Sequence, residues 1–152
     1  MRPAEVFGII KSDIQDDGLH ITGDIGLISD NVRGRTPTKT ETSRRTIPLT
    51  DKCREIFDTA AALSTNELVL QTYKGKAFNT SKVGEYIGNI SKELGIDFRA
   101  YDLRHQFATD LTMNGVDDRT RMELMGHSKY STTIGYVRSN EDKKKEAMKL
   151  IK

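Results

Sequence analysis

One stretch of the chain decides its fold: Tyr101-Asp102-Leu103-Arg104-His105-Gln106-Phe107-Ala108-Thr109. Apolar Leu103 and Phe107 are four positions apart, the spacing that lines one face of a helix. Asn114-Gly115 follows, and a glycine at this place commonly ends a helix. We therefore expect a helix over 101–113 that carries the cationic Arg104 beside an apolar face.

The chain after this helix is also expected to be helical. One helix is predicted over 118–125, where Gly126 ends it. A short helical piece over 132–138 and an amphipathic helix capped by Asn140 complete the expected C-terminal region. The apolar residues of that last helix are Ala147, Met148 and Ile151.

Before the 101–113 helix, helical and strand patterns alternate. Helices are expected over 2–11, with Pro3 in the first turn, and over 52–63, capped by Thr50. A further helix, capped by Asn79 or Thr80, carries Val83, Ile87, Ile90 and Leu94 and stops at Gly95. Strands are expected over 19–22 and 45–49, joined by a long hairpin-like segment over 23–42, and a short extended piece over 68–71. The predicted class is α+β, mainly α-helical with a small antiparallel β-sheet.

Composition places few limits on function. The 152 residues suit one globular domain, with 36% hydrophobic and 30% charged residues and a net charge of only +2. No apolar run is long enough to span a membrane. Cys53, the single cysteine, excludes an internal disulfide, is expected to be buried on a helix, and suits a reducing cytoplasmic setting.

Positive charge is concentrated locally. Between positions 33 and 54 there are seven Lys or Arg residues and two acidic ones. Such a stretch is either a phosphate-facing surface or a solvated charged loop, and its composition leaves both open. The candidate DNA-binding residues within it are Arg33, Arg35, Arg44 and Arg45.

Four short stretches stand in a characteristic order. They are Arg2-Pro3-Ala4-Glu5; Thr38-Lys39-Thr40 leading into Ser43-Arg44-Arg45-Thr46-Ile47-Pro48-Leu49; the 101–109 stretch; and Leu124-Met125-Gly126-His127-Ser128 followed by Tyr136. Arg104 precedes His127 by 23 positions, and His127 precedes Tyr136 by nine. In this order and spacing the stretches resemble the catalytic boxes of tyrosine recombinases and phage integrases.

The resemblance implies the tyrosine recombinase catalytic-domain fold and a division of chemical roles. Tyr136 would be the nucleophile that forms a 3′-phosphotyrosine, and its phenol, of ordinary pKa about 10, would need help to ionise. Arg2 and Arg104 would bind the phosphate and stabilise its developing charge. Lys39 would be the general acid for the 5′ oxygen, and His127 would hydrogen-bond the phosphate or assist proton transfer. No metal and no cofactor is implied.

One position departs from the family pattern. Tyr101 stands where most members have a histidine, and a phenol is a poor base near neutral pH. Its role is therefore either to orient the phosphate or to leave proton transfer to another group. His105 is expected to point away from Arg104, because adjacent helix residues are about 100° apart, and to act with Glu5 and Asp102 as a supporting residue.

The resemblance also bears on domains and partners. Residues 1–152 are interpreted as a truncated catalytic domain that lacks a core-binding domain and the first catalytic-domain helices. The expected partners are double-stranded DNA and further copies of the chain, in a tetramer. The segment Asn140–Lys152 docks either on a neighbouring copy or back on its own domain. A cytoplasmic protein of bacterial or phage origin is expected.

The predicted function is site-specific DNA recombination, such as integration or excision of a mobile element. Two alternatives are a DNA-binding module without catalysis and a topoisomerase of the same tyrosine chemistry. The first does not require Arg2, Lys39 and Tyr136 to be present together. The second would relax supercoils without exchanging DNA partners.

Overall fold

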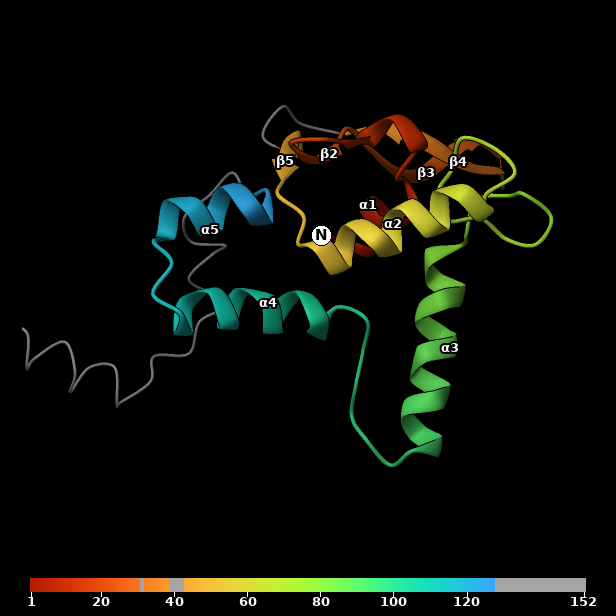
Figure 1. Ribbon diagram of the computed structural model, residues 1–152. Coiled ribbons are helices and arrows are strands. Elements are labelled where there is room, and N and C mark those ends of the chain that lie inside the picture. The colour runs from red at the N-terminus through yellow and green to blue at the C-terminus, as the bar shows by residue number, and fades with distance from the viewer. Residues whose placement is uncertain (31, 39–42, 128–152) are drawn as a thin grey trace, which may run out of the picture.

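The computed structural model describes residues 1–30, 32–38 and 43–127 (Figure 1). Within these ranges, five α-helices and one 3₁₀ turn accompany five short strands. The strands form a three-stranded and a two-stranded antiparallel sheet. This arrangement confirms the predicted α+β class, mainly helical with little sheet.

The three-stranded sheet has the order β1 (Ile14–Gln15), β2 (Gly18–Ile21), β5 (Arg45–Ile47). Leu19 of β2 pairs with Ile47 of β5, so segments far apart in sequence are joined at the centre of the fold. The segment between them forms the hairpin of β3 (Gly23–Ser29) and β4 (Val32–Pro37). The two expected strands and the hairpin between them are therefore present.

The main hydrophobic core contains side chains from the three-stranded sheet and from α2 (Asp51–Leu63). Its buried members are Ile9, Leu19, Ile21 and Val69. Thr50 caps α2 as predicted, since its hydroxyl accepts a hydrogen bond from the Cys53 amide at 3.3 Å. Cys53 itself is exposed, so the expectation that it is buried was wrong, because the core contacts α2 only from Phe57 onward.

The first helix is shorter than expected. α1 covers only Pro3–Phe7, and a 3₁₀ turn, η1, covers Lys11–Asp13. Between them, residues 9–11 form hydrogen bonds with the extended segment around Leu68, including Val69 N to Ile9 O at 2.9 Å. The helical pattern of the sequence was overridden there because pairing with residues 67–69 requires an extended backbone.

Three further helices complete the described chain. α3 (Thr80–Glu93) is capped by Asn79, whose side chain accepts from the Ser81 amide at 3.1 Å. α4 (Asp102–Met113) and α5 (Asp118–Met125) contact each other, and α5 also contacts β5 (Figure 1). The C-terminal end of α5 is thereby brought close to the start of the chain. In the described ranges, no helix combines the length and apolarity that crossing a membrane requires.

Candidate active site

The site is built around the turn that ends α5. Gly126 has φ 65°, in the left-handed region that glycine occupies without strain. Its amide donates to Glu123 O, and the amide of His127 donates to Met122 O, both at 3.1 Å. This pair of bonds is a Schellman motif, which leaves the last carbonyls of the helix available for other donors.

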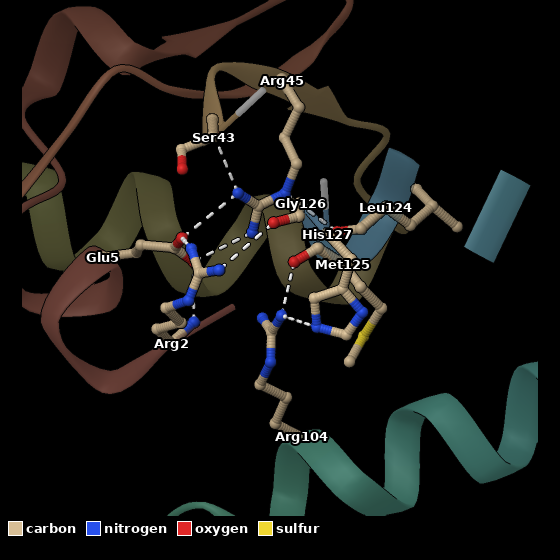
Figure 2. A network of polar contacts seen from close by, with 9 residues as sticks. All are labelled: Arg2, Glu5, Ser43, Arg45, Arg104, Leu124, Met125, Gly126 and His127. Atoms are coloured by element: carbon tan, nitrogen blue, oxygen red, sulfur yellow. Dashed lines mark hydrogen bonds and ion pairs between the residues drawn. The ribbon is translucent and has the colours of Figure 1, made fainter. Parts of the chain in front are cut away.

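Three arginines from three different elements donate to these carbonyls (Figure 2). Arg2 precedes α1, Arg45 lies on β5, and Arg104 lies on α4. The bonds run from Arg45 Nε to Leu124 O at 2.9 Å, from Arg104 Nη2 to Met125 O, and from Arg2 Nη2 to Gly126 O at 3.2 Å. The C-terminal end of a helix is negatively polarised, so it is a favourable place to gather guanidinium groups.

One buried carboxylate connects two of the arginines. Glu5 is 2% exposed and contacts Arg2 Nη1 at 2.8 Å and Arg45 Nη2 at 2.9 Å. It also accepts from the Arg2 amide at 2.7 Å, which caps α1. Burial alone would raise the pKa of Glu5, but the hydrogen bonds from Arg45 and the Arg2 amide, with both positive charges, lower it to about 2. Glu5 is therefore ionised.

His127 lies directly against Arg104. Its Nε2 is 2.8 Å from Arg104 Nη2, and both residues are buried. A guanidinium has no acceptor, so Nε2 must accept this bond and the ring hydrogen must be on Nδ1. Burial, followed by the positive charges of Arg104, Arg2 and Arg45, lowers the pKa of His127 to about 4. The imidazole is therefore neutral near pH 7.

Arg104 has donors to spare. Its guanidinium is buried, yet no described group accepts a hydrogen bond from its Nε or its Nη1. Burial, followed by the charge of Arg2, lowers the pKa of Arg104, although a guanidinium stays protonated in proteins. Unpaired buried donors cost free energy unless a ligand satisfies them. A tetrahedral anion such as a phosphate would supply the missing acceptors.

The charges around the turn point to the same kind of ligand. Arg2, Arg45 and Arg104 bring three positive charges, whereas Glu5 supplies one ionised carboxylate and His127 is neutral. The positive excess lies in a mostly buried setting, where electrostatic interactions are stronger than in water. The arrangement can bind a phosphate and stabilise additional negative charge on it.

The remaining residues predicted near Arg104 lie at the N-terminal end of α4. Tyr101 is 39% exposed and forms an edge contact with the exposed ring of His105, with centroids 5.2 Å apart. It also lines, with Arg104, an apolar cleft of about 580 Å³ between α1, α3 and α4. Asp102 accepts from the Arg99 amide at 2.7 Å, which supports the start of α4 and not the turn after α5.

The four candidate DNA-binding arginines do not share one environment. Arg44 is exposed and Arg33 half-buried. Arg35 turns inward, donating to Gly8 O at 2.9 Å and pairing with Asp13 at 3.3 Å. The Arg45 side chain is only 6% exposed. The structure therefore gives Arg45 a place inside the site instead of the DNA-facing position expected from sequence.

Some predicted residues lie outside the described ranges. These are Lys39, Tyr136 and the segment Asn140–Lys152. The proposed general acid, the nucleophile and the docking segment therefore stay predictions. Of the predicted catalytic set, the structure brings together Arg2, Arg104 and His127 around the turn after α5.

Two contributors to the site were missed from sequence. The first is the buried role of Arg45, which directly follows the exposed Arg44 in sequence. Because successive side chains of an extended segment point to opposite sides, the sequence could have suggested that one of the two points inward. The second is the row of backbone carbonyls at positions 124–126, which no side-chain pattern reveals.

Comparison with known proteins gives a consistent picture. The family model described as "Phage integrase family" matches residues 1–143. The chain is similar to tyrosine recombinase XerA of Thermococcus kodakarensis, 31% identical over 99% of this chain and 52% of that protein. It is also similar to tyrosine recombinase XerD of Listeria monocytogenes, 34% identical over 55% of this chain and 29% of that protein. The chain thus spans about half or less of the length of these relatives.

Solved structures resemble the fold. The Tn1549 transposon integrase in complex with circular intermediate DNA matches with a TM-score of 0.85 at 16% identity, over 100% of this chain and 56% of that one. The crystal structure of XerA recombinase matches with a TM-score of 0.71 at 21% identity, over 96% and 51%. At these identities the likeness establishes the fold only, and the chemistry depends on the residues of the site.

Proposed function

Because this chain belongs to the phage integrase family of tyrosine recombinases, we propose that it is the catalytic part of a site-specific DNA recombinase. Its substrate is double-stranded DNA, and its reaction is strand cleavage and rejoining. One observation carries the proposal: buried Arg104 has unpaired donors beside neutral His127, in a site with excess positive charge. Such a site fits a phosphodiester.

The proposed reaction uses Arg2, Arg104 and His127 together with Tyr136 and Lys39. The phenol of Tyr136 gives up its proton to solvent, its oxygen attacks phosphorus, the bond to the 5′ oxygen breaks, and a 3′-phosphotyrosine forms. Lys39 supplies the proton to the leaving 5′ oxygen, so the other product is a free 5′-hydroxyl. Arg2 and Arg104 bind the non-bridging oxygens, and His127 donates from Nδ1. Attack of a 5′-hydroxyl on the phosphotyrosine reverses the steps and rejoins the strand.

The charge distribution explains why the arginines are held so firmly. Negative charge increases at phosphorus as the phosphorane forms, and donors already in place need no reorganisation at that moment. Arg104 is fixed by the Met125 carbonyl, and Arg2 by Glu5 and the Gly126 carbonyl. The neutral His127 adds a donor without repelling the guanidinium next to it.

The proposal is tested by trapping the covalent intermediate. The probe is a library of nicked duplexes with a randomised core, in which the released fragment diffuses away and prevents rejoining. Wild-type protein is expected to leave DNA-linked protein on a denaturing gel, and Tyr136→Phe to leave none. Tyr73→Phe is the matched control, because Tyr73 is 93% exposed on a turn outside the site and should react like wild type.

The outcomes separate the alternatives. Equal bands from wild type and Tyr136→Phe, or none from either at concentrations that retain DNA, would favour a DNA-binding module without catalysis. If an adduct forms, sequencing the trapped duplexes identifies the target. Joining of two such duplexes then distinguishes a recombinase from a topoisomerase, which would relax supercoils and yield no joined product.

We also propose that residues 1–152 are the catalytic domain of a longer protein that acts as a tetramer on DNA. The support is that curated relatives extend to about twice this length or more. Asn140–Lys152 is the segment proposed to dock on a neighbouring copy or on its own domain. Deletion of 140–152, followed by mass measurement of the DNA complex, tests that assignment.

A further inference from the structure

Arg45 is a buried cation beside the turn that ends α5. It projects from β5, with a side chain only 6% exposed, and reaches two other elements at once. Its Nη1 and Nη2 contact Glu5 of α1 at 3.3 and 2.9 Å, and its Nε donates to Leu124 O of α5 at 2.9 Å (Figure 2). A fourth bond, from Nη1 to Ser43 O at 3.0 Å, fixes the guanidinium to the segment just before β5.

These contacts connect Arg45 to every residue that we assign to phosphate binding. Glu5, which Arg45 holds, is the carboxylate that orients Arg2. Leu124, whose carbonyl Arg45 holds, begins the turn whose next two carbonyls orient Arg104 and Arg2. The same turn ends at His127. Displacing Arg45 would therefore free both sides of the site.

Gly126 is shaped to receive this guanidinium. A Cβ built on Gly126 would lie 2.6 Å from Arg45 Nη1 and 2.9 Å from Arg45 Cζ. The backbone of the α5 turn and the guanidinium are thus packed closely, with no room for a side chain between them. A close approach of this kind fixes their separation, which hydrogen bonds alone would allow to vary.

We propose that Arg45 is a positioning residue of the recombinase, which sets the distance and orientation between Arg2 and His127 by holding Glu5 and the α5 turn together. Arg45 does not touch DNA, since its donors are engaged and its side chain is buried. This inference rests on the proposed function of the site. It removes Arg45 from the DNA-contacting residues and gives it a role in the rate of cleavage.

Two substitutions separate the contributions of Arg45. Arg45→Met retains the aliphatic stem and removes the charge and all donors, whereas Arg45→Lys retains the charge and removes the planar fork. Arg54→Met is the matched control, because Arg54 donates to the carbonyls of Gln15 and Asp16 and to no member of the site. The circular dichroism and thermal unfolding of each variant establish whether it is folded.

The first readout is kinetic. With duplexes recovered from the trapping library, single-turnover formation of the covalent adduct is measured over a range of protein concentrations. Arg45→Met is expected to lower the rate at saturation by about 100-fold, the order expected for a misplacement near 1 Å, with little change in half-saturation. Arg45→Lys should recover part of the rate, and Arg54→Met should match wild type.

The second readout requires no DNA, so it tests the position of Arg45 even if the protein does not cleave DNA. The three histidines of the chain are titrated by NMR, and His127 is assigned by its loss in His127→Gln. In wild type, His127 should titrate near the low pKa of about 4 that burial imposes together with the charges of Arg104, Arg2 and Arg45. In Arg45→Met its pKa should move toward the ordinary 6.5, while Arg54→Met should leave it low.

Together, the two readouts decide whether Arg45 positions the groups of the site. A folded Arg45→Met protein with wild-type saturating rate and unchanged His127 titration would overturn the inference. A change only in the protein concentration that gives half-saturation would also overturn the inference, because that result would mean that Arg45 contributes to DNA binding and not to the rate of cleavage. If Arg45→Met does not fold, the same comparison is made with Arg45→Lys, where a normal rate and a normal titration would be equally contradictory.

Discussion

Arg104 and His127 are 23 positions apart in sequence and 2.8 Å apart in space, joined from guanidinium Nη2 to imidazole Nε2. Because the guanidinium can only donate, this contact sets the imidazole tautomer and excludes a proton on Nε2. The spacing of 23 positions thus brings together two residues whose contact fixes where the imidazole carries its proton. The pair therefore consists of one cation and one neutral donor, as the proposed binding of phosphate requires.

Replacing Arg104 with lysine should abolish most activity while keeping the charge. Lysine cannot donate to Met125 O and His127 and also present two further donors in one plane. We expect Arg104→Lys to lower the rate of covalent adduct formation by about 100-fold or more, in line with loss of an oriented transition-state donor. Arg119→Lys, on a side chain 90% exposed, is the control and should react normally.

The unpaired donors of Arg104 predict that the free site binds inorganic phosphate. Binding to the folded state alone raises the unfolding temperature, by an amount that grows with phosphate concentration. Thermal unfolding in phosphate, with chloride of matched ionic strength as reference, should show this rise in wild type and not in Arg104→Gln. An equal rise in both proteins would mean that the anion binds elsewhere.

The pKa values of Glu5 and His127 predict that acid destabilises the fold in two stages. The folded pKa of His127, about 4, lies below its ordinary 6.5, so stability is fully present above 6.5 and decreases as pH falls toward 4. The folded pKa of Glu5, about 2, lies below its ordinary 4.5, so its stabilisation is present above 4.5 and is lost as pH falls toward 2.

Urea unfolding over this pH range tests both stages. His127→Gln should flatten the free energy of unfolding between pH 6.5 and 4 and leave the lower stage unchanged. Glu5→Gln should flatten the free energy of unfolding below pH 4.5 and leave the stage between pH 6.5 and 4 in place, in addition to causing an overall loss of stability. A wild-type curve that is level from pH 6.5 to 4 would contradict the environment described for His127.

Gly126 and Gly115 offer a matched comparison of two left-handed glycines. Their φ values are 65° and 76°, so alanine at either position should cost about 1–2 kcal/mol of backbone strain. Among the described residues, a Cβ at Gly115 meets no atom within 4 Å, whereas one at Gly126 collides with Arg45. We expect Gly126→Ala to be the more destabilising in urea unfolding.

Coupling between positions 126 and 45 follows from the same collision. In Arg45→Met the guanidinium is gone, so the additional cost of Gly126→Ala should shrink toward that of Gly115→Ala. The double-mutant cycle measures this difference directly. Strictly additive effects would show that the contact between the turn and Arg45 is not close.

Local features were predictable from sequence wherever neighbouring residues settle them. Caps such as Thr50 and Asn79, the glycine that ends α5, and the two main strands all appeared near their expected places. The site residues Arg2, Arg104 and His127 were selected by order and spacing within a family resemblance. The helix expected over residues 2–11 was too long, because pairing with the segment around Leu68 overrode local periodicity.

The sequence by itself determined which side chains can carry charge and chemistry, and where most of the helices and strands begin and end. Only the tertiary structure decided that Arg45 points inward to Glu5, and that three arginines converge on the carbonyls of residues 124–126. The physical reason is that periodicity and capping are local, whereas a backbone carbonyl accepts from whatever donor the packing of distant elements places beside it. That long-range placement brings three arginines together in one site whose geometry suits a phosphate.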